Sequence, residues 1–234
     1  MQQYFAKNKN LDLEDGDYHH IKNVMKMKRG DLIKVVYDNV IYTCKLNNVS
    51  NKSTFDIINK EEKTDKKLSV SVAFSLIKEQ KLNYLLQKTT ELGVNKLIPI
   101  ETKRSVVKIE GNKEKTKIDR WKKICKEASE QSFRADIPEI SSILTLKNLV
   151  NLDYDLKLVC SLNKNTKNIK KILEKNNKCV KILLVVGPEG GFDPLEEEYL
   201  LENGFKSVSL GENVLRAETA PVVALSMINY EFMR

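Results

Sequence analysis

The sequence is short of the residues that build metal centres and disulfide frameworks. It has 234 residues with two histidines and four cysteines, and no cysteines form a CxxC pair. This spacing favours neither a zinc site nor a set of disulfides. We therefore expect no metal, and we expect free, buried thiols in a reducing cytoplasm at Cys44, Cys125, Cys160 and Cys179.

Long apolar runs are also missing. The longest purely apolar stretch is Ile182–Val186, which is far too short to span a bilayer. The first ten residues lack the apolar core of a secretory signal. These absences predict a cytoplasmic protein with no membrane partner. With 41% hydrophobic and 31% charged residues, the chain fits one large or two modest globular domains.

Positive charge is abundant but unevenly spread. The net charge is +8, of which residues 1–68 carry +3, residues 69–180 carry +10 and residues 181–234 carry −5. Lys103–Lys126 alone holds ten basic and three acidic residues. Such a local excess is typical of a protein that binds nucleic acid, although a solvated lysine face has the same composition. Only six cations are arginines, and an arginine kept in a lysine-rich chain indicates a need for its planar, bidentate group.

The sequence pattern changes near Leu68. Residues 31–50 alternate between polar and apolar side chains around a Tyr-Asp-Asn turn, which predicts a β-hairpin. Residues 53–58 predict another strand, and the charged residues 59–67 predict an exposed connection. The inward positions of the hairpin are expected to be Ile33, Val35, Ile41 and Leu46.

From residue 69 onward, strands alternate with helices. Strands are predicted at 68–77, 94–100, 156–160, 180–187 and 205–211, with helices at 81–93, 118–134, 193–204 and 219–232. Asp193 and Glu196 form a capping-box pattern at one helix start, and Gly93 is suited to end another helix. This order implies an α/β domain with a mainly parallel sheet covered on both faces.

Helix 118–134 has two distinct sides. At the helical repeat, one side gathers a set of side chains that should face the core: Ile118, Trp121, Cys125, Ala128 and Ser132. The adjacent side gathers Arg120, Glu127, Gln131 and Arg134. That side fits either a surface ladder of ion pairs with Arg120 and Glu127 or a polar surface that reads RNA.

Two glycine-rich turns form the candidate binding site. The first, Gly187–Phe192 (GPEGGF), lacks the GxGxxG and GK[ST] spacings of nucleotide folds. Its Glu189, with Glu196–Glu198 in the next turn, would repel a polyphosphate, so the turn suits ribose, adenine or an ammonium group. A plain strand-to-helix turn has the same composition. The second turn is Leu210–Ala220, and we expect the two strands that precede the turns to lie side by side at one sheet edge.

Four ordered motifs, covering nearly the whole chain, resemble those of one family. They are His19–Asp31, Leu85–Ser105, Arg120–Ile140 and the pair GPEGGF with LGENVLRAETA. Together they are similar to the RsmE family of SPOUT methyltransferases, which use S-adenosylmethionine to methylate N3 of a specific uridine in 16S ribosomal RNA. The chain departs from the family pattern at Gln3, where arginine is usual, and at Val24–Lys26, where the family has Val-Leu-Arg.

The resemblance implies a PUA-like, RNA-binding β-barrel over residues 1–68. It also implies a SPOUT domain over residues 69–234, with a deep trefoil knot around the S-adenosylmethionine site and a homodimer that completes the site. The implied partner is the 16S RNA of the small ribosomal subunit. A non-catalytic RNA-binding assembly factor, and a SPOUT methyltransferase for another RNA, are the alternatives.

The same resemblance assigns roles to individual residues. Arg216 is expected to orient the target base or stabilise its developing charge, and Glu218 to fix Arg216 or accept the N3 proton. Contacts to the cofactor are expected from Gly187, Pro188, Glu189, Gly190, Gly191, Leu210, Gly211, Leu215, Thr219 and Ala220. Contacts to RNA are expected from Lys26, Arg29, Arg104, Arg120, Gln131 and Arg134.

Overall fold

The computed structural model describes residues 1–63, 68–163 and 166–232. The chain forms two compact units. Unit 1 consists of Met1–Asp65 and Lys126–Ile137, and unit 2 consists of Lys66–Cys125 and Pro138–Arg234. Residues 126–137, which the sequence analysis placed in the second domain, thus pack with the N-terminal strands.

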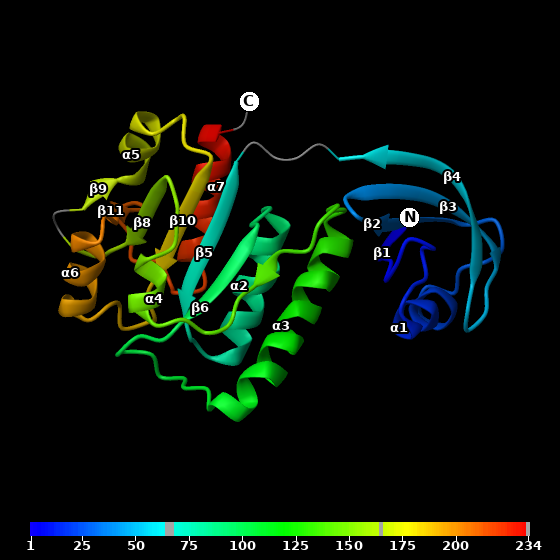
Figure 1. The fold of residues 1–234 in the computed structure, drawn as a ribbon, viewed down its shortest axis with the longest axis horizontal. Helices are drawn as coiled ribbons and strands as arrows, with labels where there is room; N and C mark the ends of the chain where they lie inside the picture. Colours follow the sequence, from blue (N-terminus) through cyan, green and yellow to red (C-terminus); the bar gives the residue numbers. More distant parts are fainter. Residues whose placement is uncertain (64–67, 164–165, 233–234) are drawn as a thin grey trace. The chain divides into compact units, whose positions relative to one another are not determined.

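Unit 1 is built on a four-stranded sheet in the order β1-β2-β3-β4 (Figure 1). Between β1 and β2 the chain forms a short α-helix, α1 (Asp15–His19), and a π-helical turn, η1 (His20–Val24). Tyr4, Ile21 and Ile33 are among the buried side chains of its core. The strands are β1 (Gln2–Phe5), β2 (Leu32–Tyr37), β3 (Val40–Asn48) and β4 (Thr54–Glu62).

The predicted hairpin is confirmed by β2 and β3, which pair in antiparallel register. Asp38 and Asn39 form its turn with φ angles of 48° and 61°, the left-handed conformation that two-residue hairpin turns require and that Asp and Asn tolerate. The expected inward residues are all buried: Ile33, Val35, Ile41 and Leu46.

The connection predicted at residues 59–67 is wrong for its first part. Strand β4 continues to Glu62, which lies opposite Val40 of β3. The charged side chains are exposed, as expected, but antiparallel pairing with β3 satisfies the backbone there and extends the strand. Residues 64–67 lie outside the described residues.

Unit 2 contains a seven-stranded sheet in the order β7-β6-β5-β10-β8-β11-β9, and all of its described strand pairs are parallel. This confirms the predicted α/β architecture. The strands are β5 (Ser69–Ser75), β6 (Lys96–Ile100), β7 (Glu139–Ile140), β8 (Leu156–Cys160), β9 (Lys167–Asn168), β10 (Lys181–Val186) and β11 (Lys206–Ser209).

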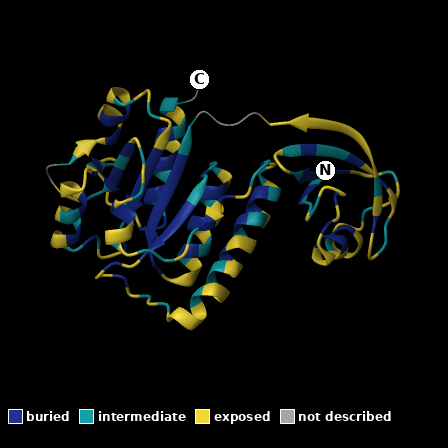
Figure 2. Ribbon diagram, viewed as in Figure 1, coloured by how far each residue is buried: buried dark blue, intermediate teal, exposed yellow. Residues whose placement is uncertain are grey.

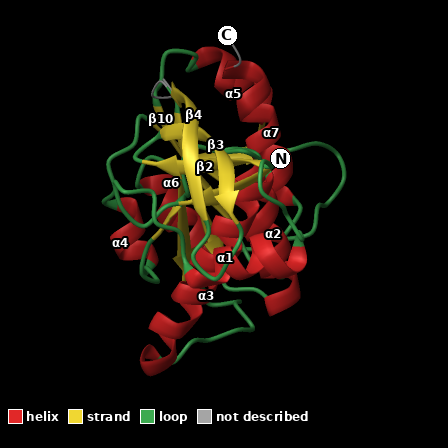
Figure 3. Ribbon diagram, turned by 90° about the vertical axis from the view of Figure 1, so that its right-hand side faces the viewer, coloured by secondary structure: helices red, strands yellow, loops and turns green. Residues whose placement is uncertain are grey.

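Helices cover both faces of this sheet (Figures 2 and 3). Alternate side chains of the central strand β10 point to opposite faces: Ile182 and Leu184 join one apolar cluster, and Leu183 joins the other. The first cluster includes side chains of α2 (Glu79–Glu91), α3 (Gly111–Gln131), α5 (Ile169–Lys175) and α7 (Ala220–Phe232). The second includes side chains of α4 (Leu146–Val150) and α6 (Pro194–Glu202).

The helix ends largely follow the sequence signals. Asp193 caps α6, and Glu196 closes the capping box; Gly93 follows α2 with φ +86°. Helix α3 starts at Gly111, seven residues before the predicted start, because its lysine-rich first turns lack an apolar period. Its predicted inner side is correct at Trp121, Cys125 and Ala128, which are buried. Within the described ranges, no helix has both the length and the apolarity needed to cross a bilayer.

Candidate active site

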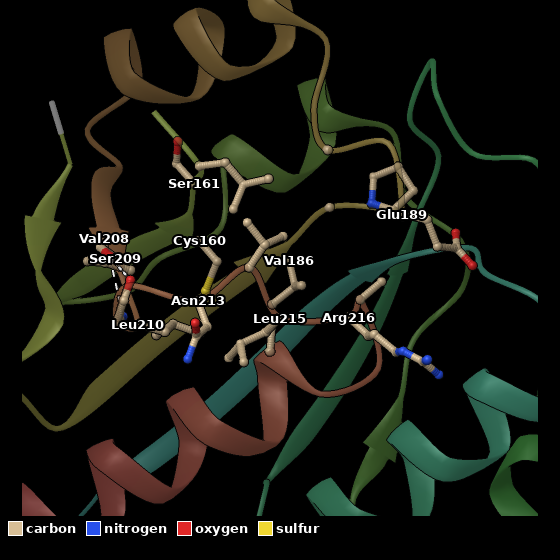
Figure 4. Close-up of a pocket in the computed structure, with 18 of the residues that line it drawn as sticks. Cys160, Ser161, Val186, Glu189, Val208, Ser209, Leu210, Asn213, Leu215 and Arg216 are labelled. Carbon is tan, nitrogen blue, oxygen red and sulfur yellow. Dashed lines mark hydrogen bonds between the residues drawn. The ribbon is translucent and has the colours of Figure 1, made fainter. Parts of the chain in front are cut away.

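A cavity of about 320 Å³ opens in unit 2 at the carboxyl ends of β8, β10 and β11 (Figure 4). Both predicted glycine turns line it, together with the segment that follows β8 and one side chain of α2. Its volume lies within the usual range for small-molecule sites. The lining segments are Lys81, Cys160–Leu162, Val186–Glu189, Gly191, Val208–Gly211, Asn213–Ala217 and Ala220.

The strand order corrects one expectation. Strands β10 and β11, which precede the two glycine turns, are not neighbours, because β8 lies between them and pairs with both. The end of β8 therefore supplies a third wall, with Cys160, Ser161 and Leu162. This segment has no motif that would reveal it in the sequence, since only the order of strands places it in the site.

The first glycine turn is restrained by contacts between its own residues. A Cβ atom added to Gly187 would lie 3.1 Å from the ring of Phe192, so this position has little room for any side chain. Gly191 has φ +67°, and its N–H donates to the carbonyl of Pro188 at 2.9 Å. Glycine is needed at these two positions for different reasons, close approach at the first and a left-handed backbone at the second.

The segment that follows β6 also forms hydrogen bonds and an ion pair with this turn and with the start of α6. The guanidinium of Arg104 donates to the carbonyl oxygen of Gly190 at 2.9 Å. The backbone N–H of Lys103 donates to Glu196 Oε1 at 2.7 Å, and Lys103 Nζ lies 3.3 Å from Asp193 Oδ1. Arg104, predicted to contact RNA, therefore also supports a wall of the cavity.

Glu189 and Lys81 form an ion pair at the cavity wall. Lys81 Nζ lies 2.9 Å from Glu189 Oε1, and both side chains are about one-third exposed. Partial burial acts to raise the pKa of Glu189, but the hydrogen bond and charge of Lys81 outweigh it and hold the pKa below its ordinary value. Glu189 is therefore ionised at neutral pH.

The second glycine turn leads directly into α7. Gly211 has φ +144°, and its carbonyl accepts a hydrogen bond from the hydroxyl of Ser209 at 3.0 Å. The carbonyl of Arg216 accepts from the N–H groups of Thr219 and Ala220 at 2.9 and 3.0 Å, which starts the helix. The Arg216 side chain is exposed and extends from the same side of the cavity as Glu189 (Figure 4).

Glu218 has a different environment from Arg216. It is 8% exposed, does not line the cavity, and its Oε2 atom has no hydrogen-bond partner among the described residues. A buried carboxylate oxygen without a partner is costly, so this atom is a candidate to accept a hydrogen bond from a bound molecule.

The structure brings most of the predicted cofactor residues together. Gly190 and Thr219 do not line the cavity, whereas the others do: Gly187, Pro188, Glu189, Gly191, Leu210, Gly211, Leu215 and Ala220. Sequence reasoning missed Lys81 and the segment at the end of β8, which includes Ser161, whereas Asn213 lies within the predicted turn Leu210–Ala220. Lys81 lies in a helix that the sequence predicts, but spacing alone does not show which face of that helix borders the glycine turn.

The predicted RNA-binding residues belong to both units. In unit 2, Arg104 and Arg120 are exposed; in unit 1, Lys26, Arg29 and Gln131 are exposed. Arg120 forms an ion pair with Glu79 of α2, so the predicted partner, Glu127, is wrong.

Arg134 is only 7% exposed, and its Nη2 lies 2.6 Å from Asp136 Oδ2. Its carbonyl oxygen accepts a hydrogen bond from the buried side chain of Gln3 at 2.6 Å. The departure from the family pattern at Gln3 therefore lies in the interior of unit 1, where it joins β1 to the segment that follows α3.

The chemistry of the lining favours a ligand with an apolar body and several hydrogen-bonding groups. Val186, Leu210 and Leu215 supply apolar surface, and the turns supply backbone groups. Charged lining residues are limited to Lys81, Glu189 and Arg216 in the described part of the chain, which does not make a cradle for polyphosphate. Across the described residues, no cluster of histidine, cysteine or carboxylate side chains could hold a metal.

Comparison with known proteins agrees with this architecture. A family model described as an RNA methyltransferase domain matches residues 64–229, and one described as an RNA methyltransferase PUA domain matches residues 13–58. Ribosomal RNA small subunit methyltransferase E of Bacillus subtilis (strain 168) is 35% identical over 249 residues, covering 99% of this chain and 97% of the relative.

Two similar solved structures contain SAM. Lpg2936 from Legionella pneumophila, solved with the bound cofactor SAM, has a TM-score of 0.89 at 28% identity and covers 98% of this chain and 97% of its own. Ribosomal RNA small subunit methyltransferase E from Neisseria gonorrhoeae, bound to S-adenosyl methionine, has a TM-score of 0.88 at 25% identity with the same coverage.

Proposed function

Because this chain belongs to the ribosomal RNA small subunit methyltransferase E family, we propose that it transfers a methyl group from S-adenosylmethionine to N3 of a uridine in 16S ribosomal RNA, uracil-1498. The observation that carries the proposal is the cavity, where two glycine turns and the end of β8 surround apolar and backbone hydrogen-bonding groups. We place the reaction in the cytoplasm.

The residues of the cavity fit S-adenosylmethionine. Apolar side chains such as Leu210 and Leu215 suit the faces of adenine, and the turns Gly187–Gly191 and Leu210–Ala220 offer backbone N–H and C=O groups to its edge and to the ribose. When bound, this cofactor supplies a methyl group on a sulfonium, with a neutral thioether as leaving group. No metal is needed to stabilise such a leaving group.

The protein's own residues act on the uracil. N3 carries a proton that must leave before or during attack, and the remaining negative charge spreads over the two carbonyl oxygens. Arg216, exposed at the cavity, is suited to donate hydrogen bonds to that charge. Glu218 does not line the cavity, and its Oε2 atom has no hydrogen-bond partner among the described residues. The proposal therefore assigns the stabilisation of charge to Arg216 and no direct part in the chemistry to Glu218.

RNA contacts complete the proposed reaction. The target base must leave its stack to reach the cavity, and exposed cations such as Lys26, Arg29 and Arg104 provide charge for the phosphates. A second copy of the chain is proposed to complete the site, and the unpaired oxygen of Glu218 is a group that such completion would satisfy.

The proposal is tested with purified protein, S-adenosylmethionine carrying a labelled methyl group, and two substrates that lack the modification: intact small subunits and free 16S RNA. We expect one methyl group per RNA, located at N3 of a single uridine by nuclease digestion and mass spectrometry. Methylation at another atom or in another RNA would overturn it. RNA binding with no uptake of S-adenosylmethionine in calorimetry would support the non-catalytic alternative instead.

A further inference from the structure

We propose that Lys81 is a second catalytic cation of this site, which donates a hydrogen bond to a carbonyl oxygen of the target uracil while Glu189 holds its ammonium group in place. This inference rests on the proposed function and deepens it. Lys81 lies in the first turn of α2, far in the sequence from both glycine turns, and no motif singles it out.

The arrangement of charges at the cavity carries the inference. In the part of the chain that the structure describes, Lys81 and Arg216 are the cations that line the cavity, and Glu189 is the carboxylate. Figure 4 shows Glu189 and Arg216 at one side of the cavity and Ser209 and Leu210 at the other. Because Lys81 Nζ lies 2.9 Å from Glu189 Oε1, the ammonium group lies at the same side of the cavity as Glu189.

Glu189 gives the ammonium group a fixed position. Its backbone belongs to the first glycine turn, which Arg104 and Lys103 hold through Gly190, Asp193 and Glu196. A lysine ammonium has three N–H donors, of which this ion pair uses one. The other donors are available to a substrate without loss of the ion pair, so Lys81 does not need to move to act.

The reaction needs positive charge at this place. As the N3–H bond breaks, its proton passes to water and its electron pair stays on N3, with negative charge shared by O2 and O4. The N3 electron pair then forms the N–CH₃ bond, and the electrons of the S–CH₃ bond remain on sulfur. Two carbonyl oxygens flank N3, and two cations line the cavity, so we assign one oxygen to Arg216 and the other to Lys81.

An alternative role for Lys81 is purely structural: it could only anchor the glycine turn through Glu189. The two roles differ in their dependence on pH. A cation that stabilises the uracil anion increases the acidity of N3–H, so its removal shifts the rate profile toward higher pH. An anchor affects cofactor binding instead, and its loss lowers the rate equally at every pH.

The experiment measures single-turnover methylation of small subunits between pH 6 and 10 for the wild type, Lys81→Gln, Lys81→Arg, Glu189→Gln and the control Lys88→Gln. Lys88 lies on the same helix and pairs with Glu91, away from the cavity. Thermal unfolding and calorimetry with S-adenosylmethionine check that each variant folds and binds the cofactor.

For Lys81→Gln we expect a rate about 100-fold lower at pH 7, with much of the loss recovered by pH 9 and cofactor affinity within threefold of wild type. Lys81→Arg should recover part of the rate. Glu189→Gln should lower the rate less than tenfold without the shift to higher pH, and Lys88→Gln should match wild type.

The inference is overturned if Lys81→Gln matches wild type. It is also overturned if Lys81→Gln and Glu189→Gln weaken cofactor binding alike and leave the pH profile of the rate unshifted. A wild-type product at another atom overturns the proposed function as well, whereas wild-type methylation at N3 with a normal Lys81→Gln profile overturns only the role of Lys81.

Discussion

At the scale of single residues, Arg216 is the group that the proposed chemistry depends on most. It follows the second glycine turn, and only its backbone carbonyl is committed to starting α7. Its guanidinium lines the cavity and is exposed. The side chain therefore contributes little to folding and is free to serve the reaction.

Arg216→Ala should lower the single-turnover rate at least tenfold and leave the affinity for S-adenosylmethionine nearly unchanged. The reason is that the variant removes charge stabilisation from the base but keeps the backbone of the second glycine turn. Rapid-quench methylation assays and calorimetry measure the two quantities. Equal single-turnover rates in the variant and the wild type would remove Arg216 from the mechanism.

Cys160, the last residue of β8, lines the cavity. The environment of its thiol can be tested through the pH dependence of alkylation. Desolvation raises the pKa of its thiol to about 12, so only about one thiol in 10⁴ is ionised at pH 8. We expect iodoacetamide to alkylate native Cys160 very slowly at pH 8, and about tenfold faster for each pH unit up to pH 10. Peptide mass spectrometry follows the reaction. In the structure Cys160 is only partly buried, against the expectation of a buried thiol, and alkylation of the native thiol at the rate seen in urea would contradict its raised pKa.

At the scale of elements, sequence patterns identified most strands and helices, because apolar periodicity and capping residues act locally. The hairpin turn at Asp38–Asn39 and the capping box of Glu196 are examples. The neighbours of each strand could not be obtained in this way. The position of β8 between β10 and β11 depends on packing over the whole sheet, so the third wall of the cavity and the approach of Lys81 were missed.

Glu196 links two elements, and its replacement should destabilise both. Its carboxylate accepts hydrogen bonds from the N–H of Lys103 and from the N–H of Asp193, at 2.7 and 3.1 Å. Glu196→Ala should lower the free energy of unfolding by about 1–3 kcal/mol, measured by urea denaturation. The exposed Glu198 on the same helix is the control, and Glu198→Ala should change stability by less than about 0.5 kcal/mol. Equal stability of the two variants would show that the link does not matter.

At the scale of the whole molecule, segments of opposite net charge suit the two ligands, RNA and S-adenosylmethionine. The segment 69–180 carries +10, whereas residues 181–234, which supply both glycine turns, carry −5. Basic surface is thus available to the RNA backbone, and the glycine turns belong to an acidic segment that does not favour phosphate. The net charge of each segment could be predicted from the sequence. The surface on which the charged side chains gather could not, because it depends on the fold.

Salt should therefore affect the two binding reactions differently. If about four RNA phosphates are neutralised, the affinity for 16S RNA should fall roughly 50-fold between 50 and 200 mM salt. The affinity for S-adenosylmethionine should change less than twofold, because its site releases few counterions. Filter binding and calorimetry give the two constants. An RNA affinity independent of salt would exclude the basic surface as the binding face.

The place of β10 has a consequence for synthesis of the protein. This strand is central in the sheet, where it joins β5 to β8, yet it is translated after both of these neighbours. Until residue 186 has emerged from the ribosome, the strands on its two sides have no common partner, and the ligand cavity has neither of its glycine turns. We therefore expect a growing chain to bind the methyl donor only after both turns have been synthesised.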